Sequence, residues 1–151
     1  MTTLKQTLRD DLTTAIKARD QLRSATLRLT LSAVGYEETA GDAHRDLSDD
    51  EVRTIITREV KKRRDAADAF TKASRADSAA RERAEAEVLT AYLPAQLSDD
   101  ELAALVAEAV TETGASGRSD MGAVMKAVQP KIAGRAEGAR LAAEVKRRLA
   151  G

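Results

Sequence analysis

Residues 47–52 read Leu-Ser-Asp-Asp-Glu-Val, and residues 97–102 read Leu-Ser-Asp-Asp-Glu-Leu. In each stretch a glutamate follows the serine by three residues, so serine hydroxyl and glutamate carboxylate can each accept from the other residue's amide. The two aspartates between them suit the positive end of a helix dipole. Each stretch therefore predicts the beginning of a helix, at Ser48 and at Ser98. This short motif recurs wherever helices are capped, and by itself it does not indicate an internal repeat.

Apolar spacing predicts helices on both sides of the first of these starts. A first helix is expected where four apolar residues recur every fourth position: Leu4, Leu8, Leu12 and Ile16. A second helix, capped by Asp20, is expected from the stripe Leu22, Ala25, Leu29, Ala33 and Tyr36. The helix that begins at Ser48 is expected to reach Phe70. After a break near residues 74–78, a fourth helix is expected to end at Tyr92.

Pro94 marks the expected boundary between two domains, because the residue before a proline is pushed out of the helical region. Beyond it we expect a fifth helix closed by Gly114, a short sixth helix capped by Ser119, and a last helix that carries Leu141, Val145 and Leu149. The fold class predicted from the sequence is all-α, with a larger N-terminal helical domain at 1–93 and a small three-helix domain at 97–151.

The composition excludes several classes of protein. The 151 residues include 25 basic and 25 acidic side chains, no cysteine, no tryptophan and a single histidine, His44. Disulfides, thiolate metal ligands and multi-histidine zinc sites are therefore not expected. The first thirty residues are too charged for a signal peptide or a membrane span. We expect a cytoplasmic protein with no cofactor, no metal site, no catalytic residues and no membrane partner.

The balanced charge conceals a local asymmetry. Residues 97–114 contain five acidic and no basic side chains, whereas residues 115–151 carry a net charge of +5. A basic stripe of this kind can follow a phosphate backbone, but it can also be the solvated face of a helix. The run Lys61-Lys62-Arg63-Arg64 is interpreted as solvated side chains beside a core stripe.

Aromatic residues are scarce, which bears on how the chain would recognise RNA. Tyr36 and Phe70 fall on apolar stripes and are predicted to lie in the core, and Tyr92 is predicted to pack at the end of its helix. Unpaired bases are usually held by stacking on exposed rings. Any RNA contact is therefore expected to involve phosphates and shape.

Three ordered blocks in the second half resemble the GatB/YqeY family. They are residues 92–98 (Tyr-Leu-Pro-Ala-Gln-Leu-Ser), residues 120–125 (Asp-Met-Gly-Ala-Val-Met) and residues 131–138 (Lys-Ile-Ala-Gly-Arg-Ala-Glu-Gly). Glu137 stands where the family usually has aspartate. Residues 11–12, 17–20 and 26–28 are similar to the stand-alone YqeY members, so the resemblance extends over essentially the whole chain.

The resemblance implies two helical domains and a relation to tRNA. The same module forms the tail of GatB, a subunit of the glutamine-dependent enzyme that amidates Glu-tRNA(Gln) or Asp-tRNA(Asn), where the tail is thought to dock tRNA. The parts of that enzyme that carry the chemistry have no counterpart in 151 residues. A label of carbon–nitrogen ligase with glutamine as amido donor would therefore be inherited from the larger protein.

The sequence leaves two functions open. The first is a non-catalytic contact with tRNA or another structured RNA, made by Lys126, Lys131, Arg135 and Arg140. Three glycines are assigned to close backbone approach or to chain reversal, namely Gly122, Gly134 and Gly138, with Arg135 expected to lie exposed beside a helix start. The alternative is a helical adaptor that binds a protein partner and no RNA.

Overall fold

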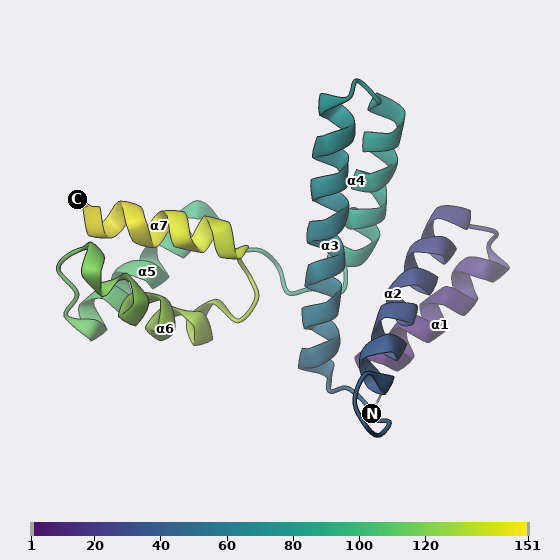
Figure 1. Cartoon of the computed structure of the whole chain (residues 1–151), viewed down its shortest axis with the longest axis horizontal. Helices are drawn as coiled ribbons and strands as arrows, with labels where there is room; N and C mark the ends of the chain where they lie inside the picture. The colour runs from purple at the N-terminus through teal and green to yellow at the C-terminus, as the bar shows by residue number, and fades with distance from the viewer. Residues whose placement is uncertain (1, 151) are drawn as a thin grey trace. The chain divides into compact units, whose positions relative to one another are not determined.

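The computed structural model describes residues 2–150, and all regular structure in that range is helical. The described residues form seven α-helices and one 3₁₀-helix, with no strand among them (Figure 1). The helices are α1 (Leu4–Lys17), α2 (Gln21–Thr39), α3 (Asp49–Lys72), α4 (Ala76–Thr90), α5 (Asp99–Thr113), η1 (Arg118–Asp120), α6 (Met121–Ile132) and α7 (Gly138–Ala150). The all-α prediction is confirmed. None of these helices is both long enough and apolar enough to cross a bilayer.

The contacts of the chain group into two compact units, Met1–Leu93 and Pro94–Gly151. We call them the N-terminal unit and the C-terminal unit and describe each by itself. That the two units are independently folded domains stays a prediction.

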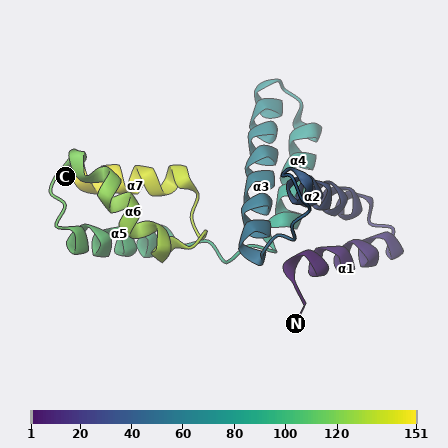
Figure 2. The same ribbon diagram turned by 60° about the horizontal axis from the view of Figure 1, so that its bottom comes forward.

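The N-terminal unit consists of two helical hairpins. α1 pairs with α2, α3 pairs with α4, and α2 contacts both α3 and α4 (Figures 1 and 2). One apolar cluster lies among the four helices and contains Leu8, Leu27, Val34, Val52, Ile55, Ile56, Val60, Ala86 and Leu89.

The buried face of α2 differs from the predicted one. Thr26 and Thr30 are fully buried beside Leu27, and both hydroxyls donate to carbonyl oxygens four residues earlier, at 2.8 and 2.9 Å. These hydrogen bonds satisfy the hydroxyls inside the helix, so the threonines pack as small apolar groups. Two residues of the predicted stripe consequently face outward: Leu29 is 58% exposed and Tyr36 is 73% exposed. Ala33 of the same stripe packs against the core. The prediction that Tyr36 lies in the core is wrong.

Other predicted positions are corrected in the same way. Ile16 is 50% exposed, and the neighbouring Ala15 is buried in its place. Phe70 is only half-buried, with the Arg75 guanidinium 5.2 Å from the centre of its ring. Arg63 is buried, unlike the solvated side chain that was expected. It lies near the carboxylates of Glu59 and Glu85, at 3.3 and 3.5 Å.

The helix caps follow the sequence closely. Complete capping boxes begin α3 and α5, at Ser48 and Ser98, and the Asp20 side chain accepts from the first turn of α2. The Ser119 cap is wrong, because the chain forms the 3₁₀ turn before α6. There the Asp120 carboxylate accepts from the amides of Ser116 and Gly117.

A buried ion pair ties three parts of the N-terminal unit together. Glu38, near the end of α2, is 3% exposed, and its carboxylate accepts from Lys5 Nζ of α1 at 2.6 Å. The same carboxylate accepts from the amide of Leu47, just before α3, at 3.3 Å. The Lys5 hydrogen bond is the main cause that lowers the pKa of Glu38 below its ordinary value of 4.5.

The C-terminal unit is built from α5, η1, α6 and α7. α5 contacts both α6 and α7, and the chain closes on itself where the Leu97 amide donates to the carbonyl of Arg135 at 2.7 Å. Its apolar cluster consists of Leu97, Leu102, Val106, Ala109, Val124, Val128, Ile132, Leu141, Val145 and Leu149.

We expect Lys5→Met to lower the free energy of unfolding at neutral pH by about 3 kcal/mol, because it leaves the buried Glu38 carboxylate without a cation. In the parent, the stability that Glu38 contributes is present above its ordinary pKa and is lost as the pH falls through its lowered folded pKa. In the variant, protonation removes the unpaired charge. The difference in the free energy of unfolding between the parent and the variant should therefore become smaller as the pH falls.

Urea unfolding of parent and variant at neutral and acidic pH measures this effect. Lys17→Met is the matched control, since Lys17 is exposed on the same helix and should change stability by about 0.5 kcal/mol or less. Equal losses for Lys5→Met and Lys17→Met, or a difference that does not depend on pH, would contradict the assignment.

Candidate nucleic-acid interface

Basic side chains in the second half of the chain form ion pairs with acidic side chains of a neighbouring helix. Lys131 of α6 donates to Glu108 Oε1 and Glu112 Oε1 of α5, at 2.8 and 3.0 Å. These bonds raise the pKa of Lys131, and the bond from Lys131 lowers the pKa of Glu108. The ammonium of Lys131 therefore already has two carboxylate partners.

Arg140 makes the corresponding connection between α7 and the beginning of α5. Its Nη2 atom donates to the carbonyl oxygen of Leu97 at 3.0 Å and to Asp99 Oδ1 at 2.9 Å. The guanidinium thus holds the N-terminal end of α5 against α7.

Arg135 does not lie exposed beside a helix start, as the sequence predicted. It is half-buried, and its Nε and Nη2 atoms donate to the carbonyls of Ile132 and Lys131, at 3.2 and 2.8 Å. A cation at the last carbonyls of a helix is stabilised by the helix dipole. Arg135 therefore caps the end of α6, and RNA binding by this residue stays a prediction.

Lys126 differs from the other three predicted contacts. It is exposed on α6 and forms no ion pair within residues 2–150. The same description holds for three cations that the sequence analysis did not select: Arg118, Lys146 and Arg148. The four predicted contacts were selected from the net charge of residues 115–151 and from the family resemblance, which do not show which cations are paired. The distinction that was missed is that none of these four forms an ion pair among the described residues, although Glu144, whose pKa is lowered mainly by Arg147, lies close enough to Arg148 for that arginine to lower it further.

The three selected glycines behave differently. Gly134 has a φ of +79° and follows Ala133, which is also left-handed, so it serves the chain reversal after α6. Gly122 and Gly138 are exposed, and a Cβ atom at either position would meet nothing within 4 Å. Helix packing inside the unit therefore does not require glycine at 122 or 138.

Tyr92, the first residue of the first motif block, connects separate parts of the N-terminal unit. Its hydroxyl donates to Asp11 Oδ2 at 2.5 Å and accepts from Arg23 Nη2 at 3.3 Å. Burial, together with the Asp11 carboxylate, raises the pKa of Tyr92 to about 12. The hydroxyl therefore keeps its proton at neutral pH, and the motif residue joins the end of α4 to α1 and α2.

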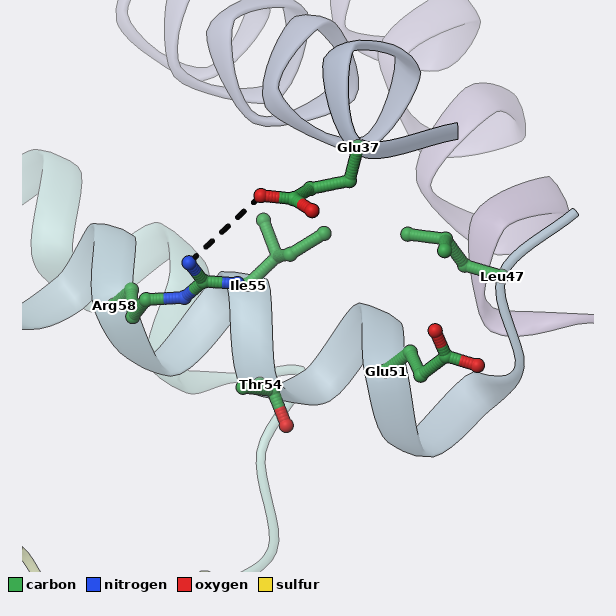
Figure 3. Close-up of a pocket in the computed structure, with 6 residues that line it drawn as sticks. All are labelled: Glu37, Leu47, Glu51, Thr54, Ile55 and Arg58. Carbon is green, nitrogen blue, oxygen red and sulfur yellow. Dashed lines mark ion pairs between the residues drawn. The ribbon is translucent and has the colours of Figure 1, made fainter. Parts of the chain in front are cut away.

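Hollows of the N-terminal unit lie between α2 and α3. One of about 130 Å³ is lined in part by Glu37, Leu47, Ile55 and Arg58, and Figure 3 shows Arg58 and Glu37 directed toward one another beside Ile55. The closest nitrogen and oxygen of this pair are 3.9 Å apart. A second hollow, of about 290 Å³, shares Glu37, Ile55 and Arg58 and adds Tyr36.

One group among the described residues has the spacing of metal ligands. The carboxylates of Glu38 and Asp46 and the imidazole of His44 lie within 4.8 Å of one another. His44 and Asp46 are exposed, and Glu38 is already held by Lys5. The Lys5 ammonium would repel a cation at the same carboxylate, so the geometry favours the ion pair.

The sequence model of the Yqey-like protein family matches residues 5–149. The chain belongs to the YqeY-like family, as the motif blocks predicted. It is also similar to a protein of Lachancea thermotolerans named altered inheritance of mitochondria protein 41, mitochondrial. The two are 32% identical over 115 residues, which is 74% of this chain and 60% of that relative. The similarity thus spans less than two thirds of the relative's length.

We expect Tyr92→Phe to lower the free energy of unfolding by about 2 kcal/mol, because it removes a hydrogen bond to the Asp11 carboxylate. Tyr36→Phe is the matched control. The Tyr36 hydroxyl has no hydrogen bond to another described residue, and the change should stay within about 0.5 kcal/mol. Urea denaturation measures both. Equal stability of the two variants would show that the Asp11 bond contributes nothing.

We expect Gly122→Ala to raise the free energy of unfolding by about 0.5 kcal/mol, since the added methyl meets open space in a helix. Gly35→Ala in α2 is the control, because its Cβ also meets nothing. If an RNA backbone approaches Gly122, the alanine should weaken tRNA binding while the midpoint of thermal unfolding rises. Unchanged tRNA affinity would show that Gly122 is not a contact.

Proposed function

We propose that this chain is a non-catalytic cytoplasmic module that contacts structured RNA, most directly tRNA, as the resemblance to the GatB tail implies. Membership in the YqeY-like family supports the proposal. In this proposal the C-terminal unit is a small three-helix domain that supplies the contact.

The proposal is carried by the exposed cations that have no ion-pair partner in the described part of the C-terminal unit. Arg118 belongs to η1, Lys126 to α6, and Lys146 and Arg148 to the last turns of α7. η1 contacts α7, and both ribbon views show the end of α7 beside the start of α6 (Figures 1 and 2). The elements that carry these cations therefore meet at one end of the unit.

Neighbouring acidic groups at this end are already engaged. Asp120 accepts from backbone amides, and Glu144 accepts from Arg147, which lowers the pKa of Glu144. A phosphate backbone would thus meet cations whose charge is not cancelled by an ion pair. The proposed contact therefore retains Lys126 and leaves out Lys131, Arg135 and Arg140, which bond within the unit.

The dependence of tRNA affinity on salt tests the proposal. Each phosphate contact contributes roughly 0.7–0.9 to the slope of log affinity against log salt. A variant in which Arg118, Lys126, Lys146 and Arg148 are all replaced by glutamine should bind tRNA more weakly, with a slope flatter by roughly 3.

A control variant removes two positive charges from the other unit. Lys17→Gln/Lys72→Gln removes two exposed lysines of the N-terminal unit and should leave the slope unchanged. The proposal would be overturned if the unmodified chain binds no tRNA. It would also be overturned if the four-site variant shows the same salt dependence of tRNA affinity as the unmodified chain. Amidation of Glu-tRNA(Gln) by the purified chain with glutamine and ATP would overturn its non-catalytic part.

The alternative function, an adaptor that binds a protein partner, has one observation in its favour. Leu29 and Tyr36 are exposed on the same face of α2, and large exposed apolar side chains are frequent at protein interfaces. A partner that remains bound to the chain after nuclease treatment, and is lost in Leu29→Ala/Tyr36→Ala, would favour the adaptor.

A further inference from the structure

Tyr36 lies at the edge of a hollow that contains two cationic side chains. Its ring is 73% exposed, and it lines the hollow of about 290 Å³ together with Arg58 and Lys62 of α3. Ala33 and Ile55 supply an apolar part of the lining. The hollow therefore combines an exposed aromatic ring, a guanidinium, an ammonium and an apolar wall in a space close to the lower size of small-molecule sites.

This combination has the chemistry that holds an unpaired nucleotide. Aromatic rings bind bases by stacking, which does not depend on base identity because every base has a π-face. Guanidinium groups bind phosphate through two parallel N–H donors. Tyr36 can supply the first contact and Arg58 the second.

Two carboxylates in the same hollow lie close to these cations and compete with a phosphate for them. Arg58 lies 3.9 Å from Glu37, which is beyond hydrogen-bond distance, and Lys62 lies 3.3 Å from Glu59. The side chains of Arg58 and Lys62 are 62% and 75% exposed. Ion pairs of this kind contribute little to stability, so a phosphate can take the place of a carboxylate as the partner of Arg58.

We propose that the hollow between α2 and α3 binds one unpaired nucleotide of an RNA strand, with its base stacked on Tyr36 and its phosphate on Arg58, assisted by Lys62. The inference rests on the proposed RNA contact and adds a second site, on the N-terminal unit, for single-stranded RNA. The cations favour a nucleotide over a protein helix, because they gather at Tyr36. Leu29, on the same face of α2, does not line the hollow.

The test uses the full chain and a short labelled oligoribonucleotide that forms no duplex, with fluorescence anisotropy as the readout. Tyr36→Ala should weaken binding by about tenfold or more, the usual effect of removing a stacking ring. Tyr36→Phe keeps the ring and should bind as the parent does. Leu29→Ala removes an exposed apolar side chain outside the hollow and should also bind as the parent does.

Arg58→Gln should weaken binding in the same assay and flatten its salt slope by roughly 0.7. Parental affinity in Tyr36→Ala would overturn the inference. Equal losses in Leu29→Ala and Tyr36→Ala would also overturn it, since they would indicate a broad apolar face of the kind that binds a protein.

The outcomes separate this inference from the proposed function. In one outcome, Tyr36→Ala binds the oligonucleotide as the parent does, and tRNA binding depends on the four cations of the C-terminal unit. This outcome overturns the nucleotide site alone. A chain that binds the oligonucleotide through Tyr36 but binds no tRNA overturns the proposed function and keeps the nucleotide site. A chain that binds neither RNA overturns both.

Discussion

In the C-terminal unit, ion pairs run from α5 to α6 and α7 around an apolar core that the same three helices enclose. Lys131 is held by Glu108 and Glu112, and Arg140 is held by Asp99 at the beginning of α5. Residues 94–151 contain as many acidic as basic side chains, so the unit as a whole is neutral. Its charge asymmetry along the sequence is largely complementarity between neighbouring helices. Within this unit, the cations outside these pairs can contact another molecule without first separating from a carboxylate.

Local signals in the sequence predicted most of the fold, because helix caps depend on residues three positions apart. The boxes at Ser48 and Ser98, the Asp20 cap and the helix end at Gly114 all formed as predicted. The failure at α2 has a different origin. Periodicity counts apolar residues, whereas burial of Thr26 and Thr30 depends on hydroxyls that bond to their own helix. That choice between faces is made by tertiary packing.

The candidate interface likewise has local features that the sequence predicts and tertiary features that it does not. Basic residues were identified correctly as a feature of the second half, but sequence spacing does not show which carboxylate faces which cation across two helices. Arg135 was selected from a motif block and Arg140 from the basic segment that follows it, and both bond to backbone carbonyls of their own unit. Two motif residues thus bond within the fold: Arg135 bonds to the end of α6, and the Tyr92 hydroxyl bonds to Asp11.

Tyr36 is exposed because of the way in which α2 packs in the N-terminal unit. Because α2 buries the face that carries Leu27, Thr30, Val34 and Glu38, the apolar side chains of Leu29 and Tyr36 are left exposed. Leaving a large ring in water forgoes the free energy that its burial would contribute. The cations Arg58 and Lys62 beside that ring favour a ligand that carries both an aromatic group and a negative charge. A base and its phosphate satisfy both features at once, which neither a purely apolar partner nor a simple polyanion does.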